Sequence, residues 1–254
     1  MKSTTILISM LLLACGSKND LVDSMPDPHQ LPPIIMGPKI PSYQSCSTHN
    51  VYKENGGLNL INPRVHLIFW GNWDQTQADN ISNTWGDLFN NYSFWGIAQE
   101  YGAGIGLLAD IINSNSDLSL TSVSDAYIRQ ELASEIYNKT LPAPDNNSIY
   151  VVLLPNGTQS DVNVQYHYSG YHGYSTFEDP AVIYSVIGYN NTANINITIS
   201  HEVLESTTDP DTITGYRGEL GETEIGDFCN DVSYVLNGIS ITKIWSQAYC
   251  KCIP

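Results

Sequence analysis

The stretch that most constrains this chain is residues 199–210, which contains the pattern His-Glu-x-x-Glu. In a helix, residues four positions apart lie on the same face, so His201 and Glu205 would project side by side. Glu202 would lie on the neighbouring flank. Two threonines and a proline follow the motif and disfavour helix there. The pattern therefore predicts a helix over 192–207 with an imidazole and two carboxylates near its C-terminal end.

This spacing is typical of one half of a metal site. In the His-Glu-x-x-His zinc proteases, two histidines at this spacing bind zinc and the glutamate between them serves as general base. By the same logic His201 and Glu205 are candidate ligands, and Glu202 is the candidate base. The pattern also occurs on ordinary exposed helix faces, so a third ligand elsewhere in the chain is needed.

A second acidic segment, residues 224–229, begins 19 residues after Glu205. Its spacing favours Glu224 as the third ligand, with Asp227 orienting His201, although the two acids are interchangeable in these roles. Four more acids lie between the two segments and are alternatives: Asp209, Asp211, Glu219 and Glu222. We expect one divalent metal, with zinc as the first choice. The oxygen-rich ligand set also suits calcium or manganese.

Residues 166–174 form a polar, aromatic segment with two histidines. Tyr171 and His172 are candidates to stabilise an oxyanion, and His172 is also a candidate metal ligand. The simpler alternative is a histidine that only hydrogen-bonds its loop. His66 lies inside an apolar run and is expected to be a core residue and not a ligand.

Apolar runs and helical periodicity outline the rest of the fold. Buried strands are expected at 65–73, 148–154 and 181–187. Helices are expected at 75–89 and 123–138. We therefore expect an α/β (α+β) fold, namely a single zincin-like domain whose mixed, twisted sheet packs on helices that include the His-Glu-x-x-Glu helix. The strand before that helix is expected at the sheet edge, where an extended peptide adds as a further strand.

The N-terminus predicts export. Lys2 precedes an apolar run, residues 6–13, which is too short to span a membrane as a mature helix. The Leu-Leu-Ala-Cys sequence that ends at Cys15 resembles a bacterial lipobox, whose cysteine becomes the lipidated first residue. We expect a lipoprotein signal peptide over 1–15, with a plain signal peptide cut elsewhere as the alternative. Gly16 gives no signal for inner-membrane retention, which favours the outer membrane in a cell that has one.

Residues 16–45 contain six prolines and few large apolar side chains. This composition predicts an extended tether between the lipid anchor and a domain over 46–254. The net charge of −16 makes nucleic acid and anionic membrane surfaces poor partners, so the lipid anchor is the expected membrane contact. We expect a monomer in the cell envelope, outside the cytoplasm.

Four cysteines remain after the lipobox. In an exported protein this number predicts two disulfides. Cys250 and Cys252 are too close together to pair with each other comfortably. Each is therefore expected to reach back, one to Cys46 and one to Cys229. Between Cys229 and Cys250, an Asn-Gly pair predicts the turn of a hairpin within 235–245.

Several segments, taken in order, carry a family resemblance. They are residues 65–73, 150–154, 170–172, 200–205, 224–229 and 245–246. Together they resemble the EXORDIUM or phosphate-induced protein 1 family of secreted plant proteins, and similar secreted bacterial and fungal proteins. The resemblance covers residues 60–252 and implies an extracellular or cell-wall location. It implies no firm biochemical activity, so the zincin interpretation comes from the residues themselves.

These features predict a surface-anchored or secreted metal-dependent hydrolase, most nearly a metallopeptidase, in which Glu202 takes a proton from a metal-activated water. The alternative is a non-catalytic cell-surface binding lipoprotein with a structural metal or none. One histidine and two carboxylates leave a divalent metal nearly neutral, which weakens its effect on water. The expected substrate or ligand is a peptide or a cell-surface polymer.

Overall fold

The computed structural model describes residues 46–53, 57–96, 98–114, 121–176, 178, 180–189, 192–219, 223–230 and 232–254. The signal peptide, Cys15 and the tether lie outside these residues, so their assignments remain predictions. Within the described part of the chain, none of the helices has both the length and the apolar character needed to cross a membrane.

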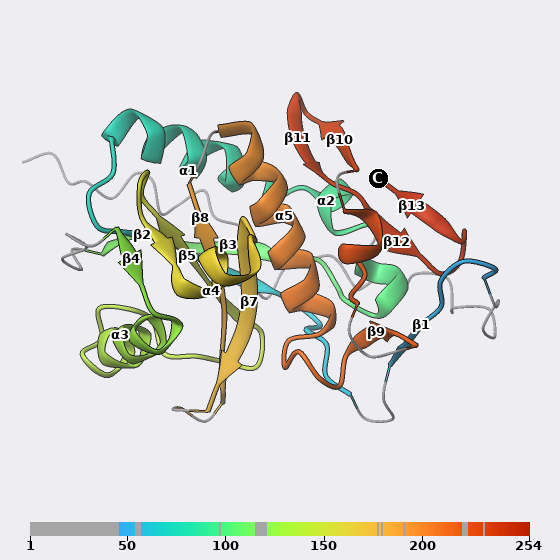
Figure 1. The fold of residues 1–254 in the computed structure, drawn as a ribbon, viewed down its shortest axis with the longest axis horizontal. Coiled ribbons are helices and arrows are strands. Elements are labelled where there is room, and N and C mark those ends of the chain that lie inside the picture. Colours follow the sequence, from blue (N-terminus) through green and yellow to red (C-terminus); the bar gives the residue numbers. More distant parts are fainter. Residues whose placement is uncertain are drawn as a thin grey trace, which may run out of the picture. The chain divides into compact units, whose positions relative to one another are not determined.

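A five-stranded mixed sheet forms the core of the domain (Figure 1). Its strands, in spatial order, are β3 (Leu107–Ser114), β2 (Arg64–Trp70), β5 (Ser148–Leu154), β8 (Val182–Gly188) and β7 (Gly170–Ser175). The first four are parallel, and β7 runs antiparallel to β8. Strands β2, β5 and β8 are buried almost throughout because both sheet faces are covered, which explains their continuous apolar runs. The three predicted strands are confirmed.

Helices cover both faces of the sheet. Alternate side chains of β2 enter two separate apolar clusters, because successive residues of a strand point to opposite faces. One cluster is shared with α1 (Gln75–Phe89) and α5 (Thr192–Thr208), and the other with α3 (Asp125–Tyr137). Asp74 and Ser124 cap α1 and α3 by accepting backbone hydrogen bonds. The mixed α/β class is therefore confirmed, with five α-helices within the described residues.

The edge of the sheet is not where the sequence pattern placed it. The strand before α5 is β8, which lies inside the sheet between β5 and β7. The edge strand is β7, one strand earlier in the chain. Its sequence is polar and aromatic, whereas β8 is apolar and buried on both faces. The prediction that the strand before α5 forms the sheet edge is therefore wrong. Strand β7 pairs antiparallel with the outer side of β8 and forms the edge itself.

Smaller elements surround the sheet. The short helices are α2 (Tyr92–Trp95), α4 (Asp161–Tyr166) and the 3-10 turns η1 (Ala98–Tyr101) and η2 (Asp227–Cys229). The small strand pairs are β1 (Val51–Lys53) with β9 (Tyr216–Gly218), β4 (Ser122–Val123) with β6 (Gln159–Ser160), β10 (Ser233–Leu236) with β11 (Ile239–Thr242), and β12 (Ile244–Ser246) with β13 (Lys251–Ile253). The predicted hairpin is confirmed as β10–β11, with Asn237 and Gly238 at positive φ in its turn.

Two disulfides hold the C-terminal strands in place. Cys46 pairs with Cys250, and Cys229 pairs with Cys252. The prediction that Cys250 and Cys252 each pair with one of the two earlier cysteines is confirmed. The second bond closes a separation of only 23 residues and fixes the end of η2, which begins at Asp227. The acidic segment is therefore attached to the C-terminal strand pair.

Candidate metal centre

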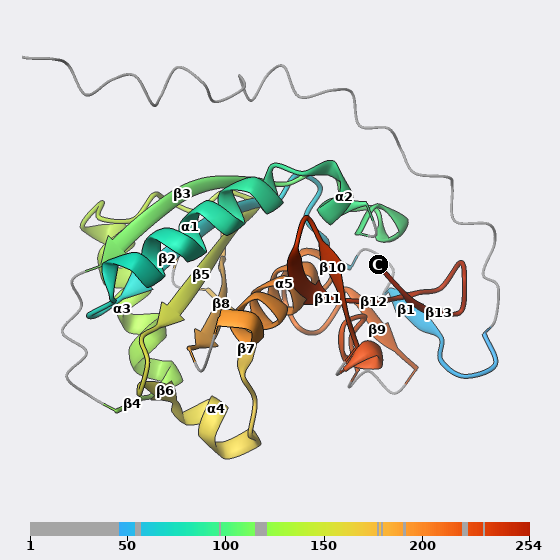
Figure 2. The same ribbon diagram turned by 90° about the horizontal axis from the view of Figure 1, so that it is seen from above.

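Helix α5 lies between the sheet and the small C-terminal strands (Figure 2), and it packs against β7, β8 and β11. A stripe of fully buried isoleucine and valine side chains forms its core side. The Oγ of Ser200 accepts a hydrogen bond of 2.9 Å from the backbone N–H of Thr242, which ties the helix to β11. His201, Glu202 and Glu205 lie on another side of the helix and line a cleft.

The cleft has a volume of about 790 Å³. Its walls come from residues 167–172, from α5 and from the acidic segment that includes Glu224 and Asp227. His172, on the edge strand β7, faces α5 across it. No lysine or arginine is among the described residues that line the cleft, so its character is acidic.

Three side chains converge at one end of α5. His201 Nε2 lies 3.1 Å from Glu205 Oε2 and 3.6 Å from Asp227 Oδ1. The three ligand-type atoms all lie within 4.8 Å of one another. Ligands of a tetrahedral zinc ion, with bonds of about 2.0–2.2 Å, are roughly 3.3–3.6 Å apart. The donor set and its spacing therefore fit a divalent metal.

The acidic segment presents Asp227 to this set and directs Glu224 elsewhere. Glu205 Oε1 accepts hydrogen bonds from the backbone N–H groups of Gly226, at 3.0 Å, and Asp227, at 3.1 Å. A Cβ at Gly226 would lie 2.7 Å from Glu205 Oε1, so the turn comes this close only with glycine. The structure thus places Asp227, and not the acid that spacing favoured, beside His201. Glu224 is the more buried of the two acids and points toward His172, whereas this turn brings Asp227 to His201.

Burial and charge act together on His201 and Glu205, the two candidate ligands on α5. Burial would lower the pKa of His201, but the carboxylates of Glu205 and Asp227 raise it well above its usual value. Burial raises the pKa of Glu205 to about 7, although His201 opposes this effect. Both groups therefore hold protons near neutral pH that a metal would displace.

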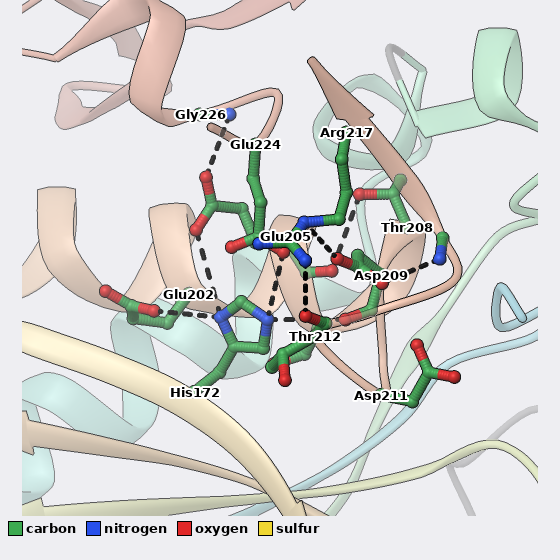
Figure 3. A network of polar contacts seen from close by, with 12 residues as sticks. His172, Glu202, Glu205, Thr208, Asp209, Asp211, Thr212, Arg217, Glu224 and Gly226 are labelled. Atoms are coloured by element: carbon green, nitrogen blue, oxygen red, sulfur yellow. Dashed lines mark hydrogen bonds and ion pairs between the residues drawn. The ribbon is translucent and has the colours of Figure 1, made fainter. Parts of the chain in front are cut away.

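His172 is the centre of a second group of contacts (Figure 3). Its side chain is only 4% exposed. Nδ1 lies 3.4 Å from Glu202 Oε2 and 3.8 Å from Glu205 Oε2. Nε2 lies 3.3 Å from the carbonyl oxygen of Asp209 and 3.5 Å from Glu224 Oε1. Burial would lower the pKa of His172, but the surrounding carboxylates, Glu224 first, raise it well above its usual value.

Behind His172 lies a layer formed by two acids that the sequence pattern singled out, Asp209 and Glu224, and by Arg217, which it did not. Asp209 is fully buried and its Oδ2 lies 3.3 Å from Arg217 Nε. Burial raises the pKa of Asp209 to about 8, and the neighbouring Glu224 adds to this shift. Burial would also raise the pKa of Glu224, but the charge of His172 lowers it to about 2. Arg217 comes from β9, which follows α5 closely in the chain, but no motif links it to Asp209, so the sequence pattern did not predict their contact.

Tyr171 and His66 lie away from the ligand set. The Tyr171 hydroxyl donates a 2.9 Å hydrogen bond to Asp125 of α3, an acceptor that it shares with Tyr184. Alternation along β7 thus turns its hydroxyl away from His172, and Tyr171 is not placed as an oxyanion stabiliser. His66 is buried, and its Nδ1 lies 2.8 Å from Asp110 Oδ2.

Loss of the Cys229–Cys252 bond is expected to weaken metal binding. Cys229 is the last residue of η2, which begins at Asp227. A Cys229→Ala, Cys252→Ala double variant therefore frees the segment that carries Asp227 from the C-terminal strand. We expect about tenfold weaker zinc binding, the usual effect of losing support around a ligand. Isothermal titration calorimetry measures this.

The Cys46→Ala, Cys250→Ala variant is the matched control. Its bond spans 204 residues, so chain entropy predicts a larger loss of stability, roughly 5 against 3 kcal/mol. The expected result is that the less stable variant binds zinc more tightly. Equal zinc affinity in the two variants would show that the Cys229 bond does not position Asp227.

Comparison with protein-family models and with curated proteins finds no match for this chain. The resemblance to the EXORDIUM family stays a prediction from the order of the motifs.

Proposed function

We propose that this protein is an exported, lipid-anchored, metal-dependent hydrolase with a zincin-like domain and a metallopeptidase-like activity. The observation that carries the proposal is the convergence of His201, Glu205 and Asp227 at ligand spacing, with Glu202 beside them in the same cleft. The lipid anchor at Cys15 and the envelope location belong to the proposal, as does membership of an EXORDIUM-like group.

His201, Glu205 and Asp227 would hold the metal. Zinc is the first choice because imidazole and carboxylate at this spacing suit tetrahedral coordination. Manganese and calcium are alternatives because two of the three donors are oxygens. The backbone hydrogen bonds to Glu205 would hold that ligand in place, as supporting contacts do in metal sites. When bound, the metal would polarise a carbonyl group and acidify a water molecule.

The chain's own residues would move the proton. Glu202 is 6% exposed, and its Oε2 lies 3.4 Å from His172 Nδ1. We assign to Glu202 the role of accepting a proton from the attacking water and returning it to the leaving amine. His172 would orient the Glu202 carboxylate. The ring of His172 is held in turn by Glu224 and by the carbonyl oxygen of Asp209.

The edge strand offers a place for an extended substrate. Among the described residues, β7 pairs with β8 on one side only. A peptide could therefore add to its other side as a further strand, next to His172 and the cleft. Peptides are thus the first substrate class to test, and an extended cell-surface polymer is the second.

A non-catalytic surface protein is the second candidate. The same ligand set, His201, Glu205 and Asp227, also favours this candidate. One imidazole and two carboxylates leave a divalent metal almost neutral, which weakens its effect on a bound water. Such a metal would act mainly as a crosslink between α5 and η2. In that case the cleft would bind a peptide or polymer without cleaving it.

Zinc binding is expected to weaken as the pH falls. The ligands bind metal only without their protons, and the pKa of Glu205 is about 7 while that of His201 is raised. Acidification from pH 8 to pH 6 should therefore lower zinc affinity by at least about tenfold. Calorimetric titrations at pH 6, 7 and 8 measure the change. An affinity that does not vary with pH would exclude these two ligands.

The direct test of the proposed function is cleavage of a broad peptide library by the full-length protein. Protein stripped with a chelator should be inactive, and one equivalent of zinc should restore cleavage. Metal-loaded protein that cleaves no peptide would favour the surface-binding alternative. Cleavage that is unaffected by stripping would exclude a metal-dependent mechanism.

A further inference from the structure

A second group of ligand-type atoms lies beside the first. His172 Nδ1, Glu202 Oε2 and Glu205 Oε2 face one another (Figure 3) at the distances given above, and ligand atoms of the three residues lie within 4.8 Å of one another. Their side chains are 4%, 7% and 3% exposed, respectively. The 3.4 Å and 3.8 Å separations are close to the roughly 3.3–3.6 Å between ligands of one tetrahedral cation.

The opposite nitrogen of His172 is already engaged. Nε2 approaches the Asp209 carbonyl oxygen and Glu224 Oε1, and both are acceptors, so Nε2 carries the hydrogen. Metal-binding histidines almost always donate their second N–H to a carbonyl or carboxylate in this way. Arg217 in turn lies 3.3 Å from Asp209. Nδ1 faces the carboxylates of Glu202 and Glu205, which are also acceptors, so a cation bound there would displace a proton from Nδ1. The contacts that would support a bound imidazole on the Nε2 side are present.

The negative charge of two buried carboxylates also favours a cation at this position. Glu202 and Glu205 are both buried around one imidazole nitrogen, and no lysine or arginine is among the described residues that line the cleft. Two buried carboxylates repel each other unless a positive charge lies between them. A protonated His172 supplies one positive charge at this point, whereas a divalent cation would supply two and leave His172 neutral.

We propose that the cleft holds a second divalent cation, bound by His172, Glu202 and Glu205, with Glu205 shared between the two positions. The proposal rests on the proposed function, because Glu205 is also a ligand of the first metal. Imidazole and carboxylate donors indicate a first-row cation such as zinc or manganese. Two cations that share a carboxylate would lie roughly 3.5–4 Å apart.

The second cation has a consequence for catalysis. A cation bound to the Glu202 carboxylate would lower its proton affinity and so weaken it as a base. Filling the second position therefore weakens the base in the proposed hydrolysis. Peptide cleavage should rise with the first equivalent of zinc and fall as the second equivalent binds.

Metal stoichiometry tests the proposal without relying on activity. Full-length protein stripped with a chelator is titrated with zinc by calorimetry, and its metal content is measured by mass spectrometry after desalting. We expect two equivalents, the second bound more weakly, and one equivalent in His172→Gln. Glu202→Gln, which changes only one atom of a buried side chain, should also lose the second equivalent and keep the first.

His167→Asn is the matched control. His167 lines the same cleft but is exposed and outside both ligand groups, and asparagine suits its positive φ of 59°. This variant should bind two equivalents. In the wild type, manganese should give an exchange-coupled electron paramagnetic resonance spectrum that His172→Gln lacks.

The outcomes separate this proposal from the proposed function. Wild type that binds no metal would overturn both. One equivalent in wild type and in His172→Gln would overturn the second position and leave the first intact. Two equivalents in His172→Gln would place the second cation elsewhere and would also overturn the proposal.

Discussion

Replacing His201 with alanine is expected to weaken the tighter of the two zinc-binding events on the order of 100-fold and to remove peptide cleavage. His201 is the only nitrogen donor in its group, and it lies within 3.6 Å of both carboxylate partners. Protein zinc sites bind with free energies of roughly 10–16 kcal/mol. Loss of one ligand of three should therefore remove about a third of the smaller value, or about 3 kcal/mol of binding free energy. Affinity should therefore fall on the order of 100-fold. Zinc titration of the stripped protein measures the loss.

His167→Asn again serves as the control, because it removes an imidazole from the same cleft but from outside the ligand groups. It should bind zinc as the wild type does. His201→Ala protein that remains folded and binds zinc with wild-type affinity would show that α5 does not hold the metal.

Replacing Glu202 with glutamine should separate metal binding from chemistry. The change keeps the shape of the side chain and leaves His201, Glu205 and Asp227 in place. With one equivalent of zinc bound, cleavage should fall by about two to four powers of ten, the usual effect of removing a positioned acid–base group. Parallel measurements of zinc content and cleavage rate test this.

Glu131→Gln provides the matched control. Glu131 lies on α3, which covers the opposite face of the sheet, so the same chemical change should leave cleavage unaltered. If Glu202→Gln cleaves peptides at the wild-type rate, Glu202 is not the base. If wild type binds zinc and no variant affects peptide binding or cleavage, the surface-binding alternative is favoured.

Much of the fold could be predicted because its strands are buried on both faces. Continuous apolar runs gave β2, β5 and β8, and periodicity gave α1 and α3. The pairing of Cys250 and Cys252 with the two earlier cysteines could be predicted because they are too close to bond to each other comfortably, but the pattern left open which pairs with which. In each case a local pattern carries the physical constraint.

The site could be predicted only in part, because its remaining features depend on tertiary contacts. Local spacing placed His201, Glu202 and Glu205 together, since they belong to one helix. The choice of Asp227 over Glu224 depends on a turn that hydrogen-bonds Glu205. The position of β7 at the sheet edge depends on strand pairing, and the Arg217–Asp209 contact joins segments that no motif links.

The metal content of the full-length protein, purified without chelator or added metal, tests the central claim most directly. If His201, Glu205 and Asp227 form a metal centre, mass spectrometry should find at least one equivalent of a divalent metal, with zinc expected first. A protein that contains no metal, and that binds none when zinc is supplied at pH 8, would contradict the account.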